Sequence, residues 1–61
     1  MIDVGETFAV IAAYLEEMHG VAVEGQSPML TADEGWVLLA SLRDGVQRVS
    51  RTMADIALTL G

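Results

Sequence analysis

Residues 39–60, LASLRDGVQRVSRTMADIALTL, carry the pattern that decides the fold. Their apolar side chains recur at alternating steps of three and four residues, and the phase is the same on both sides of Gly45. A repeat of about 3.5 residues is the spacing with which one helix packs along another. Thr31 and Glu34 match a capping box, which opens a helix. The sequence therefore predicts one helix over residues 32–60. Its apolar stripe consists of Leu39, Leu42, Val46, Val49, Met53, Ile56 and Leu60.

A shorter helix is expected over residues 4–19. Asp3 and Glu6 match a variant of the capping box, and the residues after them repeat the same spacings. Gly20 suits the left-handed conformation that often follows a helix, so residues 20–31 are expected to form the loop. The predicted fold is an all-α helical hairpin, with a short first helix and a long second helix, in a single domain of 61 residues. The inward stripe expected for the first helix is Val4, Phe8, Ile11, Leu15 and Met18.

The chain is short for an independent core. A domain of about 60 residues buries only about 60% of the surface that its unfolded chain exposes. This chain has no cysteine for a disulfide and a single histidine for any metal. Oligomerisation is the remaining common source of stability for so small a protein.

The two expected helices differ in length, because about 16 and 29 residues span roughly 24 Å and 43 Å. Folded back along residues 32–48, the first helix would leave the end of the second without an intrachain neighbour. An exposed apolar stripe of this kind normally marks a protein contact. The sequence therefore predicts a dimeric four-helix bundle. Its oligomer interface is expected to comprise Leu42, Val46, Val49, Met53, Ile56 and Leu60.

The stretch GWVLLA at residues 35–40 is apolar around a full turn, and a helix that is apolar on all sides is normally buried on all sides. One hairpin cannot bury this turn together with the similar residues of the first helix. Trp36 is expected either to anchor an interface or to close the core of the hairpin near its turn. The second apolar surface predicted in this way comprises Trp36, Val37, Leu38, Val10 and Tyr14.

Charge is distributed unevenly along the chain, whose formal net charge is −6. All three arginines lie beyond residue 34, where Asp44 and Asp55 are expected to pair with them on a solvated face. So few basic groups argue against direct nucleic-acid binding, which depends on the neutralisation of phosphates. A hairpin would gather five carboxylates at its loop end, either for solubility or as an acidic docking pole for a basic protein surface. These residues are Glu16, Glu17, Glu24, Asp33 and Glu34.

No catalytic, cofactor-binding or metal-binding residue is predicted, and no small-molecule substrate. Glu16 and His19 have the E-x-x-H spacing of some metal sites, but the second helix offers no inward carboxylate to complete one. The spacing of His19 and the serines suggests no nucleophile with its base. The uncharged stretches are shorter than the roughly 20 residues that span a bilayer, and the acidic N-terminus is unlike a secretory signal. A cytoplasmic protein without membrane contact is therefore expected.

These observations favour a noncatalytic protein-interaction or assembly module that forms homodimers through the C-terminal half of the second helix. Two other functions stay open. One is a small acidic inhibitor or adaptor that binds the basic surface of a nucleic-acid-processing enzyme, and the other is a subunit of a heteromeric complex. A break of the second helix at Gly45 would instead permit a monomeric three-helix bundle, because the uncovered stripe would then disappear.

Overall fold

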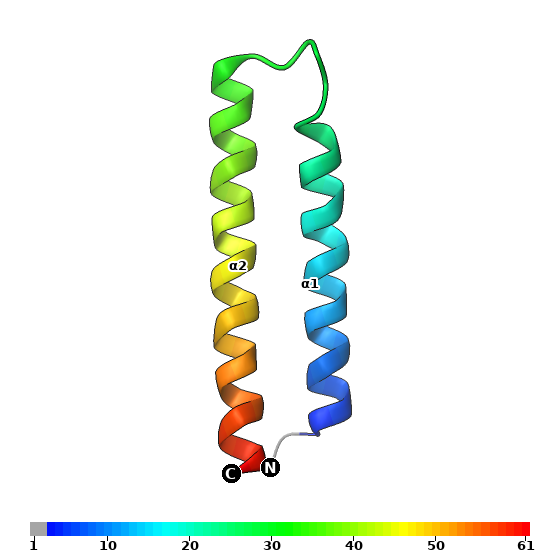
Figure 1. The fold of residues 1–61 in the computed structure, drawn as a ribbon, viewed down its shortest axis with the longest axis vertical. Coiled ribbons are helices and arrows are strands. Elements are labelled where there is room, and N and C mark those ends of the chain that lie inside the picture. The colour runs from blue at the N-terminus through cyan, green and yellow to red at the C-terminus, as the bar shows by residue number, and fades with distance from the viewer. Residues whose placement is uncertain (1–2) are drawn as a thin grey trace.

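Two antiparallel helices joined by one loop form the described part of the chain, residues 3–61 of a computed structural model (Figure 1). Helix α1 spans Val4–Glu24, helix α2 spans Ala32–Leu60, and residues 25–31 connect them. The helices lie side by side and form a rod whose Cα atoms extend over 46 × 14 × 12 Å. The prediction of an all-α helical hairpin is therefore confirmed.

Helix α1 begins where the sequence predicts but ends later. An Asp3 carboxylate oxygen accepts a hydrogen bond from the Glu6 backbone N–H at 3.1 Å, which satisfies one of the free donors of the first turn. The expected end near Gly20 is wrong, because the helix continues to Glu24 and Gly20 lacks the positive φ of a left-handed cap. Glycine inside a helix costs about 1 kcal/mol relative to alanine. Val21 is half-buried beside α2, and this burial favours the continuation of α1 past Gly20.

Helix α2 has the range expected from the sequence and is not broken at Gly45. The Thr31 hydroxyl oxygen accepts a hydrogen bond from the Glu34 backbone N–H at 3.2 Å, as in a capping box. The same hydroxyl donates to the Glu34 carboxylate at 3.0 Å. In a complete capping box, the carboxylate would instead accept from the backbone N–H of Thr31. A local cap of this kind fixes the start of the helix independently of the rest of the fold.

The helices meet along a seam, whose residues recur at alternating steps of three and four. Ile56 is the one buried side chain among residues 3–61, with 5% of its surface exposed, and the other seam residues are half-buried. This alternation is the spacing of coiled-coil packing. The seam consists of Val4, Thr7, Ile11, Tyr14, Met18 and Val21 in α1 and of Leu38, Leu42, Gly45, Val49, Thr52 and Ile56 in α2.

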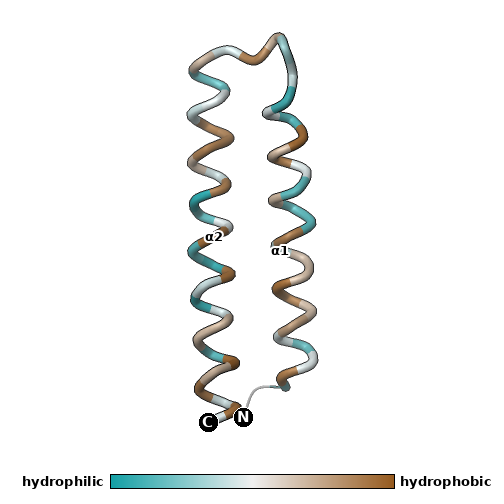
Figure 2. Tube along the Cα trace, viewed as in Figure 1, coloured by the Kyte–Doolittle hydropathy of each residue, from teal (hydrophilic) through white to brown (hydrophobic). Residues whose placement is uncertain are grey.

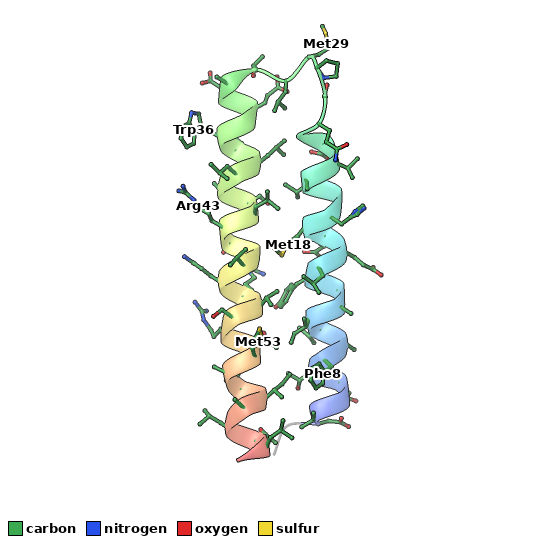
Figure 3. All side chains as sticks on the ribbon, in the orientation of Figure 1. Phe8, Met18, Met29, Trp36, Arg43 and Met53 are labelled. Carbon is green, nitrogen blue, oxygen red and sulfur yellow. The ribbon has the colours of Figure 1, made fainter. Side chains whose placement is uncertain are left out.

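Only alternate members of the stripes predicted from the sequence lie in this seam. At the positions between them, the residue that lies in the seam is the one directly before the predicted residue. Thr7 thus takes the place expected for Phe8, and Gly45 takes the place expected for Val46. Gly45 accounts for the displacement in α2, because the absence of a side chain lets the helices approach closely there. The Met18 side chain fills the space, pointing from α1 toward α2 (Figure 3).

The contacts along the seam set the register of the hairpin. Met18 lies against Gly45, and a methyl group on Gly25 would lie 3.8 Å from Leu38 Cδ1. Both pairs place Glu24 level with Leu39, and the start of α1 level with the end of α2. The longer helix α2 therefore extends beyond α1 at the loop end (Figure 1). The expectation that the C-terminal end of α2 lacks an intrachain neighbour is therefore wrong. In particular, Val49 is half-buried and Ile56 is buried within their own chain.

We expect alanine to have opposite effects at Gly20 and Gly45, two of the glycines within the helices. At Gly45 its Cβ would lie 2.7 Å from Met18 Cγ and 2.8 Å from Met18 Sδ. Overpacking costs about 1–3 kcal/mol, which exceeds the gain of about 1 kcal/mol in helix propensity. At Gly20 nothing lies within 4 Å of an added Cβ, so only the gain applies. In urea unfolding, the free energy of unfolding should be higher for Gly20→Ala and lower for Gly45→Ala than for the parent chain. Equal stabilisation by both substitutions would contradict the close packing of Met18 on Gly45.

Candidate interaction surface

The residues displaced from the seam gather on one side of the hairpin. Phe8 directly follows Thr7 and Val46 directly follows Gly45, and one step along an α-helix turns the side chain by about 100°. Because the two helices run in opposite directions, this turn carries the side chains of both helices to the same side of the seam. The other members lie at multiples of seven residues from these two. We call this side the apolar face; it comprises Phe8, Leu15, Leu39, Val46, Met53 and Leu60.

Two hollows agree with this assignment. One of about 310 Å³ is lined by both Ala22 of α1, seven residues beyond Leu15, and Leu39 of α2, so these positions share a side. Another of about 350 Å³ lies along α2 and is lined by Leu39, Arg43 and Val46, among other residues. The hollows therefore place Leu39 and Val46 on one side of the seam, together with the α1 column that contains Ala22.

Large hydrophobic side chains of the apolar face are exposed. Their exposed fractions range from 39% for Leu39 to 69% for Leu60. Phe8 and Leu15, which the sequence placed inside the hairpin, are 55% and 52% exposed. Figure 2 shows the same feature for the whole rod, because hydrophobic residues recur along both helices and not only where the helices face each other.

The predicted oligomer interface divides between this face and the seam. Val46, Met53 and Leu60 lie on the apolar face, and their contact with another molecule stays a prediction. Leu42 and Val49 are half-buried in the seam and so present only part of their surface. Ile56 is covered by its own chain, which corrects its assignment as a residue without an intrachain neighbour.

The opposite side of the hairpin is polar. A hollow of about 200 Å³ there is lined by Glu17, Ser41 and Arg48, among other residues. Arg48 Nε lies 2.9 Å from Asp44 Oδ2, as predicted, and Arg48 Cζ lies 6.0 Å from the centroid of the Tyr14 ring. Both groups of the ion pair are more than half exposed, so the pair contributes little to stability. On this side the contact between the helices is that of Arg48 with the Tyr14 ring, because the ion pair lies within α2.

The second ion pair expected on α2 does not form. Arg51 and Asp55 do not approach within ion-pair distance, and Asp44–Arg48 is the one such pair among residues 3–61. The order of charges gives the reason, because a basic residue four positions before an acidic one is the weaker orientation on a helix.

The second apolar surface predicted from the sequence does not form one surface. Leu38 and Tyr14 are half-buried in the seam. Trp36 is 65% exposed and points away from α1, so it does not close the core near the turn (Figure 3). Val37 lines the hollow at the loop end, and Val10 is 43% exposed on α1. These residues are therefore divided among the seam, the outer side of α2 and the surface of α1.

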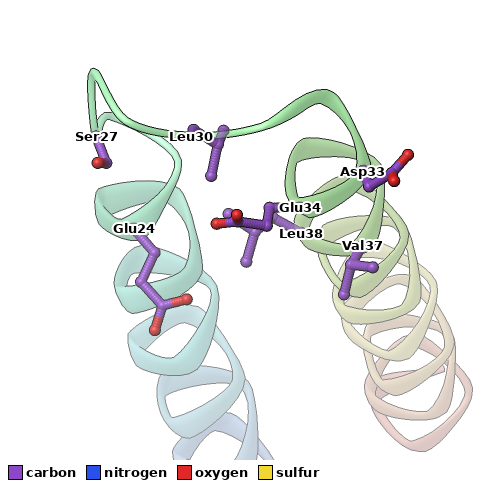
Figure 4. Close-up of a pocket in the computed structure, with 7 residues that line it drawn as sticks. All are labelled: Glu24, Ser27, Leu30, Asp33, Glu34, Val37 and Leu38. Atoms are coloured by element: carbon purple, nitrogen blue, oxygen red, sulfur yellow. The ribbon is translucent and has the colours of Figure 1, made fainter.

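Part of the predicted acidic docking pole comes together at the loop end. Glu24, Asp33 and Glu34 surround a hollow of about 630 Å³, whose other lining residues include Leu30 and Leu38 (Figure 4). The other two members, Glu16 and Glu17, lie two turns below Glu24, roughly 12 Å along the axis at 1.5 Å per residue. They are separated from the loop because α1 continues past its expected end.

The surface of the hairpin is large for its mass. Its accessible area is 4749 Å², whereas a folded monomer of 6.5 kDa exposes about 3,800 Å². Its radius of gyration is 14.4 Å, compared with about 10.5 Å for a compact domain of 61 residues. A single hairpin therefore exposes roughly 900 Å² more surface than a typical folded chain of its size.

The remaining site classes give no further candidate. Within residues 3–61, no three His, Asp or Glu side chains converge as metal ligands, and His19 is exposed within α1. Neither helix of that part of the chain combines the length and the hydropathy that a membrane span requires. Comparison with protein-family models, with curated proteins and with solved structures finds no match to this chain.

Proposed function

We propose that this chain is a noncatalytic protein-interaction or assembly module that acts through self-association of its helical hairpin. The observation that supports this function is the uncovered surface. One side chain among residues 3–61 is buried, and the exposed area exceeds the average for this mass by roughly 900 Å². A standard protein interface covers about 800 Å² on each partner. A second hairpin is therefore a partner of suitable size.

The arrangement of apolar positions supports a four-helix bundle as the product. In a two-stranded coiled coil, two of the seven positions in each heptad are apolar, and each such position forms a column of side chains along the helix. A helix of a larger bundle carries a third apolar column beside these two. Each helix of this hairpin has two columns in the seam and a third on the apolar face. In a bundle of two hairpins, the third column becomes part of the core, because each helix then packs against two neighbours.

A mass measurement tests this function. Light scattering at several concentrations should give about 13 kDa, twice the chain mass of 6.5 kDa. The thermal midpoint should rise with protein concentration, because association stabilises the folded state by mass action. A folded monomer at every concentration, with a midpoint that does not depend on concentration, contradicts the proposal.

Two results of the same measurement would overturn self-association in favour of another function. A folded monomer would leave the acidic loop end as the main surface feature, as expected for an acidic inhibitor or adaptor that binds a basic protein surface. A chain that is unfolded alone and folds only with a different protein would instead be a heteromeric subunit.

A further inference from the structure

We propose that two copies of the hairpin pack through their apolar faces with their loop ends at opposite ends of the bundle. This inference rests on the proposed function and adds to it the contacting surface and the orientation of the partner. The occupant of the apolar face is a second copy of this chain, related to the first by a two-fold axis perpendicular to the rod.

On the apolar face, large exposed apolar side chains recur along both helices, and Arg43 is the charged residue that lines the hollow shared by Leu39 and Val46. The members of this face follow each other every seven residues, two on α1 and four on α2. The other large exposed apolar side chains do not recur every seven residues within either helix; they are Val10, Val23, Met29, Trp36, Val37 and Leu58. Contact at the apolar face would also cover the outer edges of the half-buried Leu42 and Val49.

The size and shape of this face suit a second copy. The strip runs along a rod of 46 Å, and an identical strip matches its length and its seven-residue repeat. Two-fold association joins the same patch on both subunits and is the commonest closed arrangement. The surplus area of roughly 900 Å² per chain is close to the 800 Å² that each partner contributes to a standard interface.

Charge decides between two orientations of the partner. The two copies can be parallel, with their loop ends together, or reversed, with their loop ends at opposite ends of the bundle. The half of the rod near the loop, residues 16–46, has a formal charge of −5, because it carries six carboxylates and one arginine, Arg43. The other half has a formal charge of −1, because Arg48 and Arg51 offset two of its three carboxylates. Parallel packing would place the two acidic halves within a Debye length of each other, about 8–10 Å at moderate salt. Reversed packing instead places each strongly acidic half beside the nearly neutral half of its partner.

Reversed packing fixes where the two-fold axis lies. Val46 is the middle residue of α2, which spans Ala32–Leu60, and it lies on the apolar face. Positions level with Val46 therefore lie near their own copies across the dimer, whereas positions at the loop lie far from theirs. In a parallel dimer, every position lies level with its own copy.

Distances between spin labels distinguish these arrangements, and the chain has no cysteine of its own to interfere. One label is attached at Met29→Cys, on the loop, where the side chain is 84% exposed and points away from the rod (Figure 3). The matched control is Gln47→Cys, an exposed position beside Val46. We expect a Met29 distance comparable to the 46 Å length of the rod, and a Gln47 distance of roughly 15–30 Å, since packed helices lie 8–10 Å apart.

The possible outcomes separate the two proposals. A dimer in which both labels give short distances overturns the reversed orientation but leaves self-association standing. A dimer in which both labels lie more than about 40 Å apart overturns the apolar face as the contact, because packed layers are only 8–10 Å apart. A monomeric mass for both labelled variants and for the parent chain overturns the proposed function as well.

Discussion

Replacing Val46 by lysine is expected to dissociate the proposed dimer. Val46 is 56% exposed in the single hairpin and lies at the middle of the apolar face. In the proposed dimer two lysines would meet near the two-fold axis, where burial penalises each charge and the two charges repel. We expect the dissociation constant to rise by at least about 100-fold, which corresponds to about 2.7 kcal/mol. Sedimentation equilibrium of Val46→Lys and the parent chain measures the change.

Val37→Lys is the matched control for this experiment. Val37 lies in the same helix and is more exposed, at 69%, but it lies beside the loop-end hollow and away from the apolar face. Both variants change the formal net charge from −6 to −5, so neither increases overall repulsion. A lysine at position 37 also follows Asp33 by four residues, which is favourable on a helix. Equal loss of the dimer in both variants would show that the apolar face is not the contact.

Ile56→Ala is expected to lower the free energy of unfolding by about 2–5 kcal/mol, the usual cost of truncating a buried isoleucine. Ile56 has 5% of its surface exposed, and the register places it level with the first turns of α1. Leu58→Ala is the control, because Leu58 is 82% exposed only two residues away and its truncation should change stability by less than about 0.5 kcal/mol. Urea titrations at one fixed protein concentration give both values.

A marginal chain could be unfolded altogether by Ile56→Ala, so Ile56→Val provides a graded measurement. Removal of one methylene from a buried isoleucine costs about 0.5–1.5 kcal/mol. Should Ile56→Val and Leu58→Ala both leave the unfolding midpoint unchanged, the register that buries Ile56 would be wrong.

Local chemistry made the elements of this fold predictable. Thr31 and Glu34 fix the start of α2 through contacts within one turn, and Asp3 does the same for α1. The end of α1 was not predictable from Gly20, because a glycine can either cap a helix or be carried inside one by packing on both sides of it. Local signals cannot distinguish these cases when the deciding contacts lie in the other helix.

The apolar side chains were identified correctly from the sequence, but their division between the inside and the outside of the hairpin was not. A stripe chosen for hydropathy alone selects Val46 and Met53 over Gly45 and Thr52, although the latter two lie in the seam. Gly45 belongs there because it has no side chain, which allows Met18 to pack against the α2 backbone. Hydropathy measures preference for burial and carries no information about how closely two backbones approach.

The acidic residues illustrate a second limit. Five carboxylates were expected to meet at the loop, but an error of five residues in the end of α1 separates Glu16 and Glu17 from the other three. A helix advances about 1.5 Å per residue, so small errors in its boundaries move side chains by whole turns. The composition of a surface cluster is therefore less predictable than the existence of the helices that carry it.

The first residue of α1 and the last residue of α2 lie at the same end of the rod, opposite the loop (Figure 1). A polypeptide fused to either of them would depart from that end alone. In the proposed reversed dimer the two departure points would lie at the two tips of the bundle, about one hairpin length of 46 Å apart. Such a bundle would serve as a strut, with two attached cargoes held at a constant separation and facing in opposite directions.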